Sequence, residues 1–151
     1  MLREQIKAEL VAAMKAKDEA KVSTLRMIGA TLKDKDIAAR PAGKTDGISD
    51  DEILSMFQSM IKQRRESVDL YEKGGRADLA EKEKKEIEII SSFLPAQMDD
   101  DAVKAAIEAV IKETGAASMK DMGKVMGALR AKYAGQMDFG KASGLIKSLL
   151  G

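Results

Sequence analysis

Apolar residues recur every three to four positions along most of the chain, which is the spacing of one face of an α-helix. In the amino-terminal part this spacing predicts four helices joined by short connections, and such helices usually pack antiparallel. The residues predicted to face inward are Leu2, Ile6, Leu10, Ala13 and Met14 in the first helix, Val22, Leu25, Ile28, Leu32 and Ile37 in the second, Ile53, Met56, Phe57, Met60, Ile61, Val68 and Tyr71 in the third, and Ile87, Ile90, Phe93 and Leu94 in the fourth.

Polar residues and glycines mark where these helices begin and end. Asp18 is placed to cap the second helix, and Ser49 with Glu52 has the spacing of a capping box before the third. Gly74 and Gly75 end the third helix, because glycine adopts the left-handed conformation found at helix ends. The charged stretch 33–36 is interpreted as a solvated helix end, and 40–47 as a loop with little to order it.

Pro95 ends the fourth helix, and three further helices are predicted beyond it. Asp99–Asp101 opens one that Gly115 closes, residues 118–133 form the next, with Ser118 and Asp121 at its start, and Asp138 caps the last. Their inward residues are Val103, Ile107, Val110 and Ile111, then Met122, Val125, Met126, Leu129 and Tyr133, then Phe139, Ala142, Leu145, Ile146 and Leu149. We therefore predict an all-α protein with an antiparallel helical domain at 1–95 and a three-helix domain at 96–151.

Composition supports the helical prediction and removes several kinds of chemistry. The chain is 44% hydrophobic, with ten methionines but only three phenylalanines and two tyrosines. It has no Cys and no His, which excludes disulfides, thiol nucleophiles, imidazole bases and Cys/His metal sites. The net charge is +1, so no overall field draws the chain to nucleic acid. No stretch has the apolar length of a signal core or a membrane span, so we expect a cytoplasmic protein with no membrane partner.

Three patterns resemble catalytic or ligand sites, and each has a simpler interpretation. The stretch 135–141 matches the opening of a phosphate-binding P-loop, but residue 142 is Ala instead of Ser or Thr and a helix, not a strand, precedes it. Asp99–Asp101 is interpreted as a helix cap and not as a metal site. Arg64 and Arg65 could grip phosphate, although a solvated helix face with Glu partners is favoured. No catalytic residue, metal or cofactor is predicted.

The helices predicted at 118–133 and after Asp138 share an unusual feature, a row of small residues beside lysines. Gly123 and Gly127 are four apart, as are Gly140 and Gly144, and glycine inside a helix costs about 1 kcal/mol relative to alanine. Residues 120–147 hold six Lys or Arg and two Asp, a local balance of +4. Small residues edged by lysines let a phosphate chain approach the helix backbone. The alternative is that the two glycine faces pack on one another or on residues 1–95.

The candidate RNA-binding residues combine these glycines with the basic and hydroxyl side chains around them. They are Lys120, Gly123, Lys124, Gly127, Arg130, Lys132, Gly140, Lys141, Ser143, Gly144 and Lys147. No exposed aromatic row accompanies them, so recognition of the RNA backbone or shape is favoured over base stacking.

Several stretches resemble one family of small bacterial proteins across essentially the whole chain. The carboxy-terminal ones are Lys120-Asp-Met-Gly-Lys-Val-Met-Gly127, Asp138-Phe-Gly-Lys141 and the final Ile-Lys-Ser-Leu-Leu, and the amino-terminal ones are Leu25-Arg-Met-Ile28, Gln63-Arg-Arg-Glu-Ser67 and Phe93-Leu-Pro-Ala-Gln97. Together they resemble the YqeY-like family. That family shares a helical module with the tail of the B subunit of the glutamine-dependent aminoacyl-tRNA amidotransferase, and the likeness to the tail falls on Gly123, Val125 and Met126.

The resemblance implies an all-helical, two-domain protein whose carboxy-terminal module binds tRNA as a non-catalytic adaptor. Two alternatives stay open. One is a protein-interaction module that packs its glycine faces and methionine stripes against a partner or a second copy. The other is an accessory factor of a carbon–nitrogen ligase that uses glutamine as amido donor, with the amidotransferase or other translation components as partners. The pattern does not decide the oligomeric state.

Overall fold

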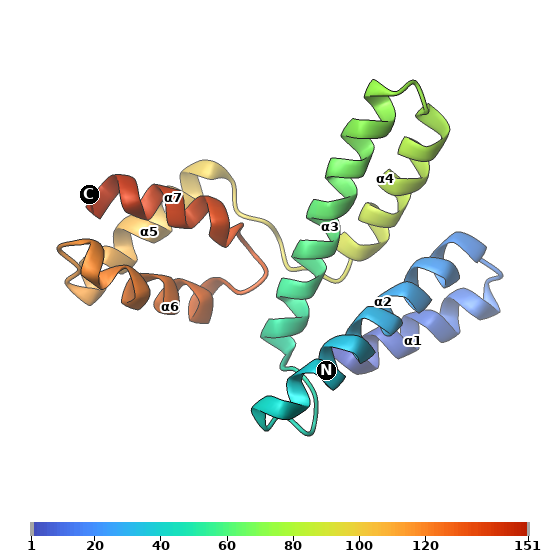
Figure 1. Ribbon diagram of the computed structural model, residues 1–151, viewed down its shortest axis with the longest axis horizontal. Helices are drawn as coiled ribbons and strands as arrows, with labels where there is room; N and C mark the ends of the chain where they lie inside the picture. The colour runs from blue at the N-terminus through green and yellow to red at the C-terminus, as the bar shows by residue number, and fades with distance from the viewer. Residues whose placement is uncertain (1, 151) are drawn as a thin grey trace. The chain divides into compact units, whose positions relative to one another are not determined.

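The computed structural model describes residues 2–150, and helix is the only regular secondary structure in that range. The amino-terminal helices are α1 (Leu2–Lys15), α2 (Glu19–Ala39), the short η1 (Arg40–Ala42), α3 (Asp50–Lys73) and α4 (Ala77–Ser91). The carboxy-terminal ones are α5 (Asp100–Thr114), the short η2 (Met119–Asp121), α6 (Met122–Tyr133) and α7 (Phe139–Leu150). The prediction of an all-α protein is confirmed (Figure 1).

Contacts divide the chain into two compact units, Met1–Phe93 and Leu94–Gly151. In the first unit α1 and α2 form one antiparallel hairpin and α3 and α4 another, and α2 also packs on α4 (Figure 1). Fully buried Leu25, Ile28, Ile53 and Ile90 join the hairpins through one core, where Phe57 stacks on Phe93 with ring centroids 5.3 Å apart. We predicted separate domains at residues 1–95 and 96–151, and their independent folding stays a prediction.

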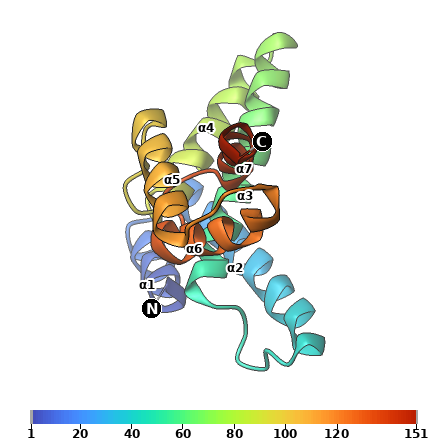
Figure 2. The same cartoon turned by 90° about the vertical axis from the view of Figure 1, so that its left-hand side faces the viewer.

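In the second unit α5, α6 and α7 pack pairwise around a small aliphatic core, and Figure 2 gives a second view of these helices. The residues of that core with no more than 2% exposure are Ile107, Val110, Val125, Leu129, Met137, Ala142 and Ile146. Most of the inward residues predicted for these three helices are therefore correctly placed.

Most predicted helix starts are confirmed, because they depend on residues close in sequence. The Asp18 carboxylate accepts from the Lys21 amide at 3.2 Å, and Ser49 with Glu52 forms a full capping box. The start predicted at Ser118 is wrong: its side chain makes no capping hydrogen bond, and η2 precedes α6, which begins at Met122. Asp121 instead accepts from the amide of Ala117 at 3.0 Å and holds the turn before the helix.

Some residues predicted to face inward are exposed. Met14 is 50% exposed and Ile37 45%, while Leu145 and Leu149 on α7 are 37% and 44% exposed. The physical reason is that α1 packs mainly on α2, and that within its own unit α7 packs on α5 and α6, so the apolar stripe of each helix is wider than the face that these neighbours cover. Apolar side chains therefore line parts of both units that face solvent.

An ion pair orders the loop after α2, where the sequence predicted a solvated helix end. The Arg3 guanidinium donates to both carboxylate oxygens of Asp36 at 2.6 Å and to the carbonyl of Ile48 at 2.9 Å. The same carboxylate accepts from the Ile48 amide at 2.9 Å. The Arg3 hydrogen bonds hold the pKa of Asp36 below its usual range. Gly47, at φ +94°, passes so close that an added methyl carbon would lie 2.5 Å from Arg3 Nη2.

Arg64 also differs from its predicted place on a solvated helix face. Its side chain is only 13% exposed, and its guanidinium lies 3.0 Å from Glu86 and 4.0 Å from Glu83 of α4. It also donates to the carbonyl of Met60 and to the sulfur of Met27 on α2. Burial raises the pKa of the Glu83 carboxyl, and the nearby charge of Glu86 raises it further. Arg64 is therefore a contact between three helices.

Candidate nucleic-acid interface

The glycines of α6 and α7 lie on the outer faces of these helices. The inner faces carry Val125, Leu129 and Ile146 into the core, whereas Gly123, Gly127 and Gly144 are exposed. Beyond the helix's own backbone, a methyl carbon built on any of these three glycines meets no atom of the carboxy-terminal unit within 4 Å. The alternative that the glycine faces of α6 and α7 pack on one another is therefore wrong, whereas packing of these faces on residues 1–95 stays a prediction.

Gly140 and Ser143 differ from these three glycines, because they do not lie in open space on the outer face of α7. A methyl carbon at Gly140 would lie 3.1 Å from the Asp138 carboxylate, which accepts from the amides of Gly140 at 2.8 Å and Lys141 at 3.3 Å. Gly140 is therefore part of the cap of α7, as the sequence predicted for Asp138. Ser143 is half-buried and lies at the edge of the outer face.

The basic residues around the glycines are all exposed, and they differ in what they contact. Within the described chain no hydrogen bond or ion pair engages the side chains of Lys120, Lys141 or Lys147. Lys124 Nζ donates to the carbonyl of Thr114 at 3.2 Å. Lys132 is paired with Glu113 of α5, and this hydrogen bond raises the pKa of Lys132. Its charge is therefore compensated, and it is the weakest of the basic candidates.

One contact joins the outer face of α6 to the start of α7. The Arg130 guanidinium lies over the ring of Phe139, 5.8 Å from its centroid, within the range of a cation–π interaction. The sequence placed Phe139 in the core and gave no signal for this contact, because the two residues belong to different helices. The arginine therefore lies over one face of the half-buried ring, and a base would compete with Arg130 for that face.

The acidic run before α5 is a cap. The Asp99 carboxylate accepts from the Ala102 amide at 2.7 Å, in the first turn of the helix. Among residues 2–150, no three Asp or Glu side chains gather closely enough to hold a metal ion. No helix in that range has both the length and the apolar character needed to cross a membrane.

The chain is similar to fungal proteins named "Altered inheritance of mitochondria protein 41, mitochondrial". It is 32% identical to the one from Vanderwaltozyma polyspora over 78% of this chain and 64% of the relative. The identity is 36% with the Eremothecium gossypii protein, over 60% and 48%, and 31% with that of Saccharomyces cerevisiae strain YJM789, over 73% and 60%. The chain thus spans about half to two thirds of the length of these curated relatives.

These names contradict the expectation of a cytoplasmic protein, because they place the relatives in mitochondria. The expectation relied on the lack of an apolar signal core. That pattern concerns secretion, whereas mitochondrial import signals are amphipathic and rich in arginine.

The family comparison extends over almost the whole chain. The family model described as "Yqey-like protein" matches residues 3–150, and so it includes both units and the glycine faces of α6 and α7. This agrees with the resemblance that the sequence motifs carried in both halves of the chain. The chain belongs to the YqeY-like family.

Proposed function

We propose that the carboxy-terminal unit binds RNA through the outer faces of α6 and α7, with tRNA as the first candidate, and that the chain is a non-catalytic adaptor. One observation carries the proposal: Gly123, Gly127 and Gly144 have open space around them while exposed lysines lie beside them. Each glycine costs its helix about 1 kcal/mol relative to alanine, and no packing within the carboxy-terminal unit offsets that cost. Close approach of an external partner to the helix backbone would offset it.

The chemistry of these faces favours the sugar–phosphate backbone over the bases. Lys120, Lys141 and Lys147 offer positive charge to phosphates, and the exposed helix backbone leaves room for them to approach. Arg130 already lies over one face of the Phe139 ring, which makes base stacking on that face less favourable. The shared module of the amidotransferase B subunit tail supports tRNA as the partner.

The experiment is a titration of the full chain with tRNA at two salt concentrations. Changing Lys120, Lys124, Lys141 and Lys147 to Ala is expected to weaken binding and to reduce the salt slope by about four counterions. The matched control changes Lys35, Lys62, Lys73 and Lys85, which are exposed on the other unit, to Ala. If both variants lose affinity equally, the effect is one of net charge and the proposed surface is wrong.

A second pair of variants tests the role of the glycines. Gly127→Ala and Gly144→Ala are each expected to stabilise the chain by about 0.5–1 kcal/mol, because a methyl group there meets nothing, and to weaken tRNA binding. Gly29→Ala in α2, which also meets nothing, is expected to leave tRNA binding unchanged. Unchanged binding in the α7 and α6 variants would show that RNA does not approach these backbones.

A protein partner is the second candidate. Met119, Leu145 and Leu149 are 37–44% exposed near the same helices, and a partner protein could cover them. This candidate predicts a stable complex with no salt-sensitive affinity for RNA. The accessory role beside a carbon–nitrogen ligase predicts a changed rate when the chain is added to a reconstituted tRNA amidation reaction, and an unchanged rate at every concentration would exclude it.

A further inference from the structure

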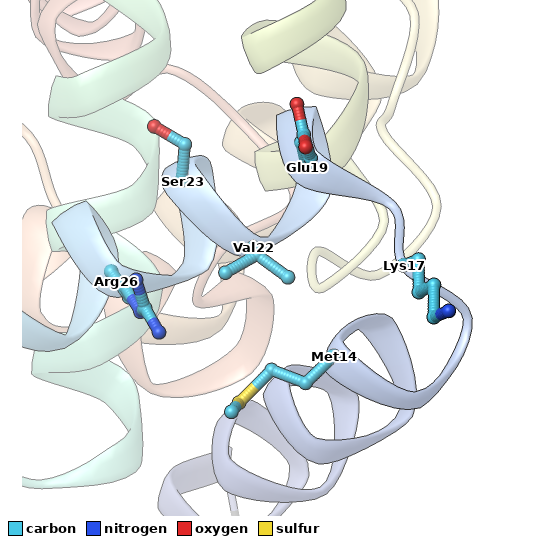
Figure 3. A pocket seen from close by; sticks show the side chains of 6 residues that line it. All are labelled: Met14, Lys17, Glu19, Val22, Ser23 and Arg26. Carbon is cyan, nitrogen blue, oxygen red and sulfur yellow. The ribbon is translucent and has the colours of Figure 1, made fainter.

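A second surface lies on the amino-terminal unit, where α1 and α2 leave an open groove between them. A pocket of about 560 Å³ lies at the end of the hairpin, lined by Met14, Lys17, Glu19, Val22, Ser23 and Arg26. Figure 3 shows Val22 pointing from α2 toward α1, with Met14 of α1 below it and Arg26 and Lys17 on either side. The sequence had placed both Met14 and Val22 in the core.

The apolar part of this groove is exposed to water. Of the two apolar residues in the lining, Met14 is 50% exposed and Val22 is half-buried. Val11, which precedes Met14 by three residues on α1 and lies outside the lining, is also 50% exposed. Residues 7, 11 and 14 are spaced four and three apart, so Lys7, Val11 and Met14 lie on one face of α1. Covering these exposed aliphatic side chains with an apolar partner surface removes them from water and is therefore favourable.

The charged residues of the pocket lining are two cations, Lys17 and Arg26, and one anion, Glu19. Two further lysines, Lys7 and Lys33, lie on α1 and α2 outside that lining. Lys7, Lys17, Arg26 and Lys33 are exposed, and among residues 2–150 none of them is held by a hydrogen bond or an ion pair through its side chain. On α2, residues 22, 26, 29 and 33 follow helical spacing, so Arg26 and Lys33 lie on the same side as Val22. The groove thus combines an aliphatic centre with a basic rim.

We propose that this groove binds an amphipathic helix of a partner protein, one that carries aliphatic residues flanked by Asp or Glu. Its aliphatic side chains would cover Val11, Met14 and Val22, and its carboxylates would pair with Lys17 and Arg26. An RNA backbone fits less well, because phosphates leave the aliphatic centre in contact with water. The proposal is independent of RNA binding by the other unit.

The test uses a designed peptide and the methionine methyl group as a reporter. The probe is a synthetic helical peptide of about 20 residues with Leu at helical spacing and Glu on both sides of the Leu row. It is titrated into the full chain labelled with ¹³C at the methionine methyl groups, and the Met14 signal is assigned with Met14→Leu. A matched peptide has Lys in place of every Glu. The acidic peptide is expected to shift the Met14 signal, and the basic peptide is not.

Charge-reversal variants locate the contact. Lys17→Glu with Arg26→Glu is expected to weaken binding of the acidic peptide about tenfold, because two attractive pairs become repulsive. The control, Lys35→Glu with Lys73→Glu, makes the same change in net charge at exposed sites outside the pocket and is expected to bind like the parent chain. Met14→Gln keeps every charge, and an exposed site tolerates it. Because this variant lacks the reporter methyl group, its binding is followed by the fluorescence anisotropy of a dye-labelled acidic peptide, and it is expected to bind more weakly than the parent chain.

Three results would overturn the proposal. One is equal binding of the acidic and basic peptides, and another is equal affinity of the Lys17/Arg26 variant and its control. The third is a Met14 shift caused by tRNA that the acidic peptide competes away, which would make the groove an RNA surface instead.

Discussion

At the scale of single residues, Gly47 is the position where the backbone most clearly requires glycine. Its φ of +94° is one that other residues rarely adopt, and its Cα lies against the ion pair between Arg3 and Asp36. A side chain at 47 would push apart the Arg3 and Asp36 groups that hold the loop to α1 and α2. Gly43 has a similar φ of +85° but open space around it. A substitution at Gly43 therefore meets only backbone strain, whereas one at Gly47 meets backbone strain and steric overlap.

Gly47→Ala is therefore expected to destabilise the chain more than Gly43→Ala does. In both variants the left-handed backbone lowers the free energy of unfolding by about 1 kcal/mol. Gly47→Ala also disturbs the ion pair, so its total loss is about 2–3 kcal/mol. Urea unfolding followed by circular dichroism measures both. Equal costs for the two variants would show that the ion pair yields without loss.

The same ion pair predicts a pH dependence with a definite sign. The pKa of Asp36 is lower in the folded chain than its usual value of 3.8, so the folded state prefers the charged form. Its contribution is present above that value and is lost as the pH falls through the lower, folded pKa. Asp36→Asn is expected to have a lower free energy of unfolding than the parent chain at pH 7. In strong acid this difference is expected to become smaller. A difference that stays constant down to the acid limit would contradict this assignment.

At the scale of elements, the contact between α3 and α4 contains a carboxylate that is unfavourably placed. The pKa of Glu83 is raised above its usual 4.5, so stability falls as the pH rises from that value through the folded pKa. The neighbouring Glu86 instead makes the 3.0 Å ion pair with Arg64. The charged carboxylates of Glu83 and Glu86, one turn apart on α4, are thus expected to have opposite effects on stability.

Glu83→Gln is expected to raise the free energy of unfolding at pH 7. The gain is expected to shrink as the pH falls through the raised, folded pKa and to vanish below 4.5, where the parent carboxyl is neutral in the folded and the unfolded chain. Glu86→Gln is the matched control and is expected to lose about 1–3 kcal/mol, because it leaves the largely buried Arg64 without its closest carboxylate. Urea unfolding at pH 7 and at a pH below 4.5 measures the free energy of unfolding of both variants. A loss of stability in Glu83→Gln would mean that its charge is needed by Arg64.

The elements were largely predictable from the sequence, while the contacts between them were not. Caps at Asp18, Ser49 and Asp138 depend on residues three apart or fewer, and the sequence contains that information. The pairing of Arg3 with Asp36 and the stacking of Arg130 on Phe139 join different helices, and no local pattern encodes them. Periodicity likewise finds an apolar stripe but not how much of it a neighbour covers, which is why Met14 was misplaced.

At the scale of the whole molecule, the chain separates into two units after Phe93, each with its own core. A fragment of residues 94–151 is expected to fold alone, with a stability of no more than about 3–5 kcal/mol, because a unit of this size buries little apolar area. Circular dichroism and thermal unfolding of the fragment test this. A fragment without helical signal would show that the second unit depends on the first.

The open glycines of α6 have a consequence for how this helix moves. Gly123 and Gly127 weaken the helix without gaining contacts within their own unit, so the amide groups of α6 are expected to open locally and exchange with deuterium sooner than those of the core helix α3. A ligand that covers these amides would slow their exchange more than anywhere else in the chain. Deuterium labelling can therefore map an unknown partner on α6 before the partner has been identified.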